Sequence, residues 1–219
     1  MKNIEILYED DFFLVVNKPA GLAVQGGKGI NVSLDKILDR HLKDSGGGQA
    51  FPVHRLDRDT SGVILTAKTK DAAASISRLF NSNRTGKESV KKQYIAVCSG
   101  CPINDGGSIT LDLMIRDSIK KSETRYKVIK NDKLGDVEFS ALELELGTGR
   151  MHQIRRHLAM CQTPILGDDK YGDFSLNKIL RKSMGLKRLL LHASRLVVKG
   201  GYNLEINAPL PEYFMPYFK

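Results

Sequence analysis

Residues 137–158 read VEFSALELELGTGRMHQIRRHL, a long strand-like run followed by a turn and a short basic helix. Polar and apolar residues alternate in the second half of VEFSALELEL, which is typical of a half-buried β-strand. After the glycine-containing turn, Ile154 and Leu158 are four residues apart, as on one face of a helix. Because a strand and a helix adjoin here, this stretch favours an α+β fold.

Short strand-like runs predominate in the rest of the chain. We predict strands at Ile4–Tyr8, Phe12–Asn17, Val63–Lys68, Gln93–Cys98, Ile109–Ile115, Thr124–Lys130, Val137–Leu146, Arg195–Val198 and Asn203–Ile206. We predict helices at Ser33–Leu42, Asp71–Asn81 and His152–Met160. Without repeats, linkers or an internal boundary, residues 1–219 are expected to form a single domain with a largely antiparallel sheet.

The composition excludes several classes of protein. With 41% hydrophobic and 27% charged residues, the chain resembles soluble globular proteins, so dominant disorder is excluded. No apolar run approaches the roughly 20 residues that span a bilayer, and the acidic N-terminus is unlike a signal peptide. Three cysteines are too few for a disulfide scaffold, which favours a reducing compartment, and we expect a cytoplasmic protein.

The net charge of +9 favours a polyanionic partner, with nucleic acid first and an anionic membrane second. The charge is concentrated in Arg78–Lys92, Arg116–Lys133 and Lys170–Lys199, the last of which holds eight basic residues and one acid. Each run alone could be a solvated face. A phosphate-facing surface shared by all three is the functional alternative.

Residues 53–62 read VHRLDRDTSG and directly precede an apolar strand. Two arginines flank Asp57, and their positive charge would keep its carboxylate ionised. Such a carboxylate is either part of a structural salt bridge or a nucleophile. Spacing alone favours the salt bridge.

Two further motifs invite a ligand or metal interpretation. The helix start after Gly147 could hold phosphate with its N–H groups and arginines, but it matches neither a dinucleotide fingerprint nor a P-loop. His152 and His157 are five residues apart, which is wrong for a helical metal pair. Cys98 and Cys101 form a CxxC motif without a second pair or a βαβ context, so incidental cysteines are favoured and no metal site is expected.

Six motifs together resemble the RluA family of pseudouridine synthases over nearly the whole chain. They are NKPAGLAVQGG (17–27), HRLDRDTSG (54–62), KKQYIAV (91–97), GTGRMHQIRRHLA (147–159), PILGDDKYGD (164–173) and LLLHASRL (189–196). Six motifs in the family's order make chance implausible. The resemblance reverses the salt-bridge interpretation of Asp57.

The resemblance implies a role for individual residues. Asp57 would be the nucleophile, Arg155 would pair with it, and Tyr94 would stack on the target base and assist proton removal. The substrate-binding set comprises Arg55, which would replace the flipped uridine in the RNA stack, pocket residues Ile154 and Leu191, and His54, Arg58, Arg150 and His152 from the same motifs. The histidines could equally bind the loop backbone.

The resemblance also implies a fold and a reaction. The fold would be a mixed, mostly antiparallel bent sheet with flanking helices and a central basic cleft. The reaction would detach uracil at its ring nitrogen, turn it and reattach it to ribose through carbon 5. This isomerisation needs neither cofactor nor metal, and the base must first flip out of the RNA. The carboxylate could attack either the ribose or the uracil ring.

The substrate remains open between two RNA classes. Many family members carry an N-terminal RNA-binding domain, for which the early motif at Asn17 leaves no room. That departure resembles the branch acting on tRNA or short stem-loops, whereas KSETRYKV (121–128) resembles the branch acting on large-subunit ribosomal RNA. We favour structured ribosomal RNA and expect a monomer. A non-catalytic RNA-binding module on the same scaffold is the alternative from another class.

Overall fold

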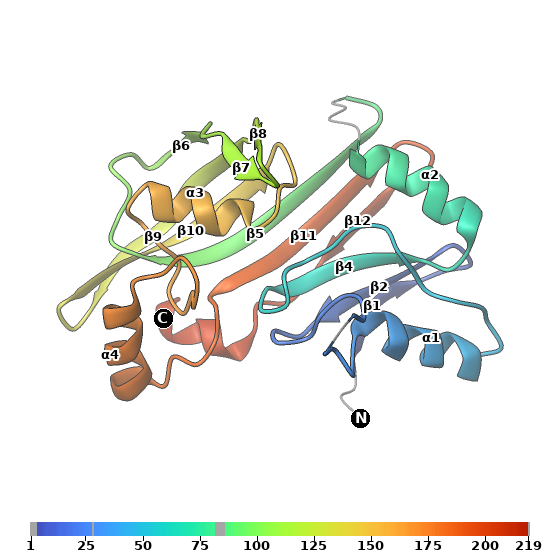
Figure 1. Ribbon diagram of the computed structural model, residues 1–219, viewed down its shortest axis with the longest axis horizontal. Coiled ribbons are helices and arrows are strands. Elements are labelled where there is room, and N and C mark those ends of the chain that lie inside the picture. The colour runs from blue at the N-terminus through green and yellow to red at the C-terminus, as the bar shows by residue number, and fades with distance from the viewer. Residues whose placement is uncertain (1–3, 28, 82–85, 219) are drawn as a thin grey trace. The chain divides into compact units, whose positions relative to one another are not determined.

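The computed structural model describes residues 4–27, 29–81 and 86–218. Contacts group the chain into two compact units, one formed by residues 1–92 and 193–209 and the other by residues 93–192 and 210–219. Each unit combines antiparallel strands with a few helices (Figure 1). The predicted α+β class with a mostly antiparallel sheet is confirmed. A single catalytic domain, a bent sheet and a basic cleft stay predictions.

The first unit is built around two fully enclosed strands, β2 (Phe13–Lys18) and β4 (Ser61–Ala67). They pair antiparallel, with Val16 opposite Ile64. Nearly every side chain on both strands is buried, which is why each contains an uninterrupted apolar run, Phe13–Val16 in β2 and Val63–Leu65 in β4. The other elements of this unit are β1 (Glu5–Glu9), α1 (Leu34–Asp44), β3 (Phe51–Pro52), α2 (Lys70–Asn81) and β12 (Leu204–Asn207).

The second unit has the strand order β5-β10-β9-β6. Its elements are β6 (Gly106–Ile109), β7 (Leu113–Ile115), β8 (Ser118–Lys120), β9 (Thr124–Leu134), β10 (Val137–Leu146), α3 (Gln153–Met160), α4 (Phe174–Met184) and the 3-10 helix Glu212–Tyr217. Helix α3 lies across β9 and β10 (Figure 1). Two long strands, β5 (Ser89–Ser99) and β11 (Leu191–Lys199), contribute residues to both units.

The structure adds the short elements β3, β6, β8 and the 3-10 helix to the predicted ones, and extends β5, β9 and β11 beyond their predicted bounds. Two further differences are larger. The strand predicted at Ile109–Ile115 is broken, because Ile109 pairs with β9 while Leu113 pairs with β8 in a separate hairpin. Helix α4 was not predicted, because its apolar face is short and only Asn177 and Leu180 are buried. Its capping residues are ordinary helix signals: Asp173 is the N-cap, and Gly185 after the last turn has a left-handed backbone conformation.

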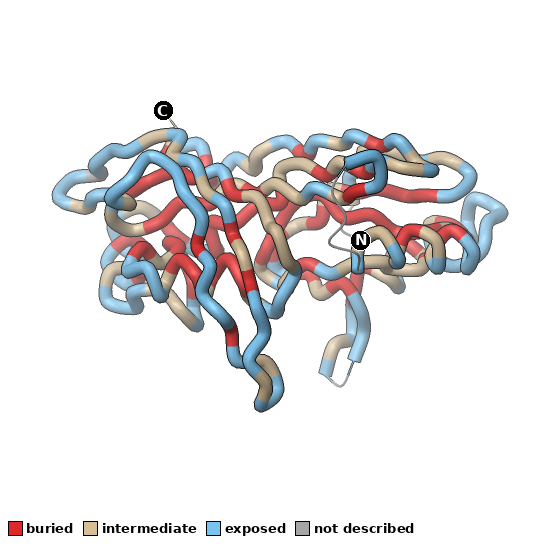
Figure 2. Tube along the Cα trace, turned by 90° about the horizontal axis from the view of Figure 1, so that it is seen from above, coloured by how far each residue is buried: buried red, intermediate tan, exposed pale blue. Residues whose placement is uncertain are grey.

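Burial is concentrated in β2 and β4 of the first unit and in β5 and β10 of the second, whereas β1, β6 and β9 are largely exposed; Figure 2 shows burial along the chain. No helix among the described residues is long and apolar enough to cross a membrane. The same residues contain no group of three or more histidine, cysteine, aspartate or glutamate side chains that could hold a metal ion. Residues 82–85 of the predicted basic run Arg78–Lys92 lie outside the described residues.

Candidate active site

Asp57 lies half-buried in the loop between β3 and β4 of the first unit. Its carbonyl accepts a hydrogen bond from the Thr60 N–H at 3.2 Å, which closes a turn just before β4. Gly62 in β4 has a φ of +114°, and a Cβ atom there would lie 2.1 Å from the Ala193 carbonyl oxygen. Only glycine therefore permits this close approach of backbones, which fixes the end of the Asp57 loop.

Lys18, whose side chain is 0% exposed, supports the loop that carries Asp57. Its Nζ donates to the carbonyl oxygens of Pro19 at 3.1 Å, Leu22 at 2.9 Å and Arg58 at 3.0 Å. Burial lowers the pKa of Lys18 to about 7, against the opposing charges of Asp59 and Asp57. All three ammonium hydrogens bind carbonyls, so Lys18 anchors the loop backbone and acts on the Asp57 carboxylate through its charge.

The two arginines beside Asp57 are both exposed. Arg58 binds the preceding motif, since its Nε donates to the Gly21 carbonyl at 3.3 Å and its own carbonyl accepts from the Gly21 N–H at 2.9 Å. Arg55 lies on the same loop and is also exposed.

His54 is tied to the backbone of β4. Its Nε2 accepts the Leu65 N–H at 3.0 Å, and its ring stacks on Phe80 with centroids 4.5 Å apart. Burial, assisted by the charge of Lys92, lowers the pKa of His54 to about 3. The imidazole is therefore neutral near pH 7, and Nδ1 carries the proton because Nε2 is an acceptor.

In the second unit, the start of α3 is organised by Gln153. Its Oε1 accepts from Thr148 Oγ1 at 2.7 Å and from the Arg150 N–H at 3.0 Å, while its Nε2 donates to the Glu123 carbonyl at 2.8 Å. The residue before it, His152, has a left-handed backbone with φ 53°. The buried amide thus shapes the turn that leads into the helix.

Arg155 projects from α3 into a buried polar cluster and is 5% exposed. Its Nε and Nη2 donate to the two carboxylate oxygens of Asp168, each at 2.7 Å, and Nη2 also reaches Asp169 at 3.2 Å. The guanidinium lies 5.3 Å from the ring centroid of Tyr171. Both the edge and the face of this arginine are therefore engaged.

The charge of Asp168 is stabilised within its own loop. Burial alone would raise the pKa of Asp168, but hydrogen bonds from Arg155 and from the backbone N–H groups of Tyr171 and Lys170 outweigh it and lower the pKa below its usual value. The carboxylate is therefore ionised at neutral pH, and it neutralises the charge of Arg155.

The other predicted residues of this unit lie on three elements. Tyr94 is 6% exposed on β5, opposite Leu144 of β10. Ile154 on α3 and Leu191 at the start of β11 are both buried.

Two polar residues of the predicted substrate-binding set flank the start of α3. His152 lies 3.0 Å through Nδ1 from the Tyr171 hydroxyl, and exposed Arg150 donates from Nε to the Lys121 carbonyl at 3.4 Å. Both side chains contact loops of the second unit, so the turn before α3 is fixed from both sides.

The sequence-predicted residues thus fall into two groups, each assembled within one unit. The first unit holds His54, Arg55, Asp57 and Arg58, and the second holds Tyr94, Arg150, His152, Ile154, Arg155 and Leu191. Sequence reasoning missed the residues that support them, namely Lys18, Gln153, Asp168 and Tyr171. All four belong to the quoted motifs, so polar residues within those motifs were the available signal.

The CxxC motif is divided between two environments. Cys98 is buried on β5, where burial raises its pKa far above the usual thiol value, and Cys101 is exposed beyond the strand end. A thiol with a raised pKa is a poor nucleophile and a poor metal ligand at neutral pH. The arrangement agrees with incidental cysteines.

Comparison with known proteins assigns the family. Residues 12–160 match the family model described as RNA pseudouridylate synthase. The chain belongs to this family. It is 36% identical to "Ribosomal large subunit pseudouridine synthase C" of Rickettsia bellii, over 95% of this chain and 69% of that protein. It is 34% identical to "tRNA pseudouridine synthase C" of Pasteurella multocida, over 89% of this chain and 85% of that protein.

Solved structures of the family share the fold. The chain superposes on "Human RNA Pseudouridylate Synthase Domain Containing 4" with a TM-score of 0.81 and 27% identity, covering 96% of this chain and 90% of that one. The predicted RluA-type family and isomerase class are confirmed by these findings. The residue roles stay predictions.

Proposed function

We propose that this protein converts a uridine of structured RNA to pseudouridine, with Asp57 as the nucleophile and Arg155 as its paired cation. The observation that carries the proposal is Asp57 itself. In a chain of this family, it lies on a loop that the buried Lys18 anchors through the neighbouring Arg58 carbonyl. A carboxylate needs such a fixed backbone to attack one carbon atom selectively.

The reaction breaks the bond between uracil N1 and ribose C1′ and forms a bond between C5 and C1′. The hydrogen on C5 is lost and N1 gains one, so the atoms balance without a redox partner, and no cofactor or metal is needed. Asp57 would attack either the ribose or the uracil ring as a transient covalent partner. The detached base must stay enclosed, which suits the buried apolar Ile154 and Leu191.

The remaining residues receive roles in substrate binding. Tyr94 would stack on the target base and assist loss of the C5 proton. Arg55, which is exposed, would take the place of the flipped uridine in the RNA stack. Arg58, Arg150, His54 and His152 would contact the RNA or hold the loops that do so.

For the substrate we propose large-subunit ribosomal RNA, with tRNA as the alternative. The proposal is supported by the KSETRYKV segment and by relatives named for the ribosomal large subunit, while another relative is named for tRNA. We further propose that residues 1–219 act as one catalytic domain, as a monomer, in the cytoplasm.

Tritium release from RNA labelled at uridine C5 tests the proposal directly. Unmodified ribosomal RNA and a tRNA pool are treated in parallel with wild type and with Asp57→Asn. We expect release by wild type from ribosomal RNA and a loss of at least about 10⁴-fold in Asp57→Asn, because an amide cannot act as the nucleophile.

Three results would contradict parts of the proposal. Release by Asp57→Asn at the wild-type rate would exclude Asp57 as the nucleophile. Release from tRNA alone would replace the ribosomal substrate. RNA binding without release from either pool would favour the non-catalytic binding module.

A further inference from the structure

Asp168 is a buried carboxylate in the loop between α3 and α4, and both of its oxygens bind Arg155. Oδ2 accepts from Nε at 2.7 Å and Oδ1 accepts from Nη2 at 2.7 Å. Two short parallel bonds of this kind fix the plane of a guanidinium as well as its position. Because these two hydrogen bonds occupy Nε and Nη2 of Arg155, they also fix the direction in which its Nη1 points.

The loop holds this carboxylate independently of Arg155. Oδ1 of Asp168 also accepts the backbone N–H groups of Lys170 and Tyr171, both at 2.9 Å. Asn177 of α4 donates from Nδ2 to the Asp168 carbonyl at 3.0 Å and accepts the Gly167 N–H at 2.8 Å. The carboxylate is therefore part of a rigid loop that α4 clamps from one side.

Close packing leaves this loop little freedom to move. A Cβ atom on Gly172 would lie 2.4 Å from the Asp168 carbonyl oxygen and 2.9 Å from Asn177 Nδ2. The neighbouring carboxylate of Asp169 also reaches Arg155, at 3.2 Å, but is 77% exposed. Of the two acids, only Asp168 is buried and held in place, so it determines where the guanidinium lies.

The face of the guanidinium is defined as well. Tyr171 of the same loop lies under Arg155, with 5.3 Å between Cζ and the ring centroid, and its hydroxyl lies 3.0 Å from His152 Nδ1. One loop thus controls both the edge and the face of the arginine. A free arginine would lose side-chain entropy on each encounter with substrate, whereas this one is ordered beforehand.

We propose that Asp168 is a positioning residue for the isomerisation, which it serves by holding Arg155 in the orientation that the reaction uses. The inference rests on the proposed function, because it needs Arg155 to act on the reacting carboxylate. Asp168 is 1% exposed and both of its carboxylate oxygens bind Arg155, so it would act on the reaction through that arginine. A purely structural role, as a clamp between α3 and α4, is the competing explanation.

Asp168→Asn tests the proposal with a minimal change. The amide oxygen can still accept from Lys170, Tyr171 and Arg155 Nη2, but an NH₂ group then faces the Nε–H donor. We expect kcat for tritium release to fall about 10- to 100-fold, since small misplacements of a catalytic group have effects of this size. KM and the RNA dissociation constant should stay within about twofold, because substrate contacts are unchanged.

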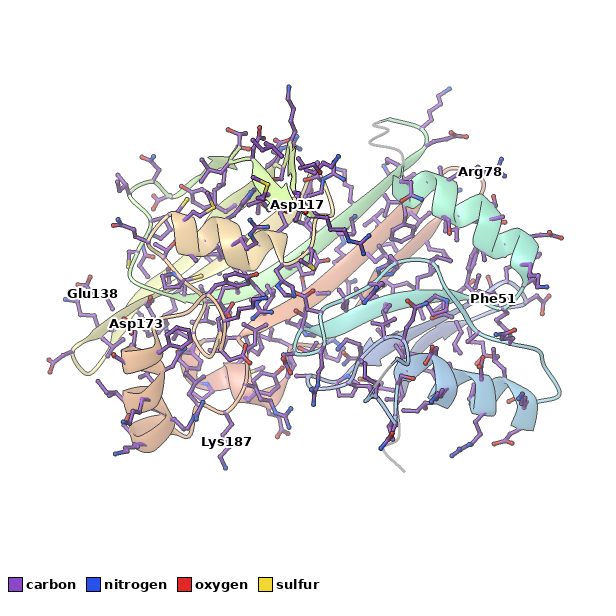
Figure 3. The ribbon with its side chains drawn as sticks, in the orientation of Figure 1. Phe51, Arg78, Asp117, Glu138, Asp173 and Lys187 are labelled. Atoms are coloured by element: carbon purple, nitrogen blue, oxygen red, sulfur yellow. The ribbon has the colours of Figure 1, made fainter. Side chains whose placement is uncertain are left out.

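Two further variants separate positioning from stability and from charge. Asp173→Ala removes the N-cap of α4, whose Oδ1 accepts from Leu176 N at 2.9 Å, without touching Arg155 (Figure 3 labels Asp173). It should lower Tm and leave kcat unchanged. Asp168→Glu keeps the charge but displaces it by one methylene, so kcat should fall. This variant also tests the proposal if Asp168→Asn does not fold. All are assayed at least about 10 °C below their own Tm.

The outcomes distinguish this inference from the proposed function. No release by wild type, or full release by Asp57→Asn, would mean that the proposed function fails. With those two controls as expected, a wild-type kcat in Asp168→Asn or Asp168→Glu would overturn the positioning role. So would an equal loss of kcat in Asp173→Ala, which would show that loop stability alone matters.

Discussion

In each unit, a buried polar residue supports the candidate functional residues of that unit. Lys18 is enclosed in the first unit and gives all three of its ammonium hydrogens to backbone carbonyls. Burying a charge costs free energy unless it is hydrogen-bonded, and the three carbonyl oxygens supply those hydrogen bonds. Its role is to order the backbone next to Asp57.

Lys18→Met should therefore affect both stability and catalysis. Methionine fills a similar volume but removes the donor to the carbonyls of Pro19 and Leu22 and leaves the Arg58 carbonyl with the Gly21 N–H alone, which should cost about 2–4 kcal/mol of unfolding free energy. Loss of loop order should lower kcat about tenfold or more. Urea unfolding and tritium release measure the two effects.

Lys36→Met on the exposed face of α1 is the matched control and should change neither quantity. An active and equally stable Lys18→Met protein would show that the loop is held by other contacts.

His54 predicts how stability depends on pH. Its pKa is about 3 in the folded protein, below the 6.5 of an unperturbed histidine. Between these values the unfolded chain binds more protons, so the free energy of unfolding falls as pH is lowered from 6.5 towards 3. His157, whose pKa burial also lowers, acts in the same direction.

His54→Gln should make this pH dependence shallower. The glutamine oxygen can still accept the Leu65 N–H, but it does not titrate. Urea unfolding of both proteins at pH 8 and pH 4.5 measures the change in unfolding free energy. The value at pH 8 is the reference, because histidine is neutral there in both the folded and the unfolded state. Parallel losses of stability in wild type and variant on acidification would contradict the assignment.

Helix α3 begins where it does because of hydrogen bonds made before its first turn. Left-handed backbone at His152 costs free energy, and the Gln153 side chain offsets it with bonds to Thr148, Arg150 and Glu123. The helix start thus depends on Glu123, which directly precedes β9, as well as on the turn itself. Its orientation in turn decides where Arg155 points.

Gln153→Leu should loosen this start. The Glu123 carbonyl and the Thr148 hydroxyl would lose buried partners, lowering the unfolding free energy by about 2–4 kcal/mol. Gln153→Glu keeps the acceptor for Thr148 and Arg150 but replaces the amide donor to the Glu123 carbonyl. Its loss of unfolding free energy should therefore lie between those of wild type and Gln153→Leu. Thermal unfolding of the three proteins decides, and a Tm of Gln153→Leu equal to wild type would refute the network's importance.

At the scale of the whole molecule, charge distribution governs RNA affinity. Helix α4 carries Lys178, Arg181 and Lys182 with no acid, and Lys187 follows it and points away from the ribbon (Figure 3). The basic residues of α1, in contrast, alternate with three aspartates. An unbalanced basic helix is the better candidate for phosphate contacts.

We expect RNA affinity to fall at least about tenfold between roughly 50 and 200 mM salt. Replacing Lys178, Arg181 and Lys182 with glutamate should reduce the slope of log Kd against log salt by about two to three. The matched control reverses Lys36, Arg40 and Lys43 on α1, which gives the same change in net charge. Equal effects of the two triple variants would mean that only net charge matters.

Much of the fold and of the family assignment is determined by the sequence itself. The run VEFSALELEL predicted β10 at its observed bounds: its second half alternates from Leu142 on, as a half-covered strand does, while Phe139–Leu142 are all buried. Ordered motifs predicted the pseudouridine synthase family, since the reaction requires particular residue types at particular places. The local sequence pattern wrongly predicted one continuous strand at Ile109–Ile115. There, hydrogen bonds from His157 and Ser122 to the Leu111 carbonyl replace strand pairing.

The tertiary structure alone decided which buried groups bind one another. Lys18 meets the Arg58 carbonyl 40 positions away, and Arg155 meets Asp168 13 positions away, on a different element. A sequence shows that a residue is charged, but not whether folding removes it from water. Burial is what turns these charges from solvated side chains into fixed supports, because an unpartnered charge away from water is too costly to keep.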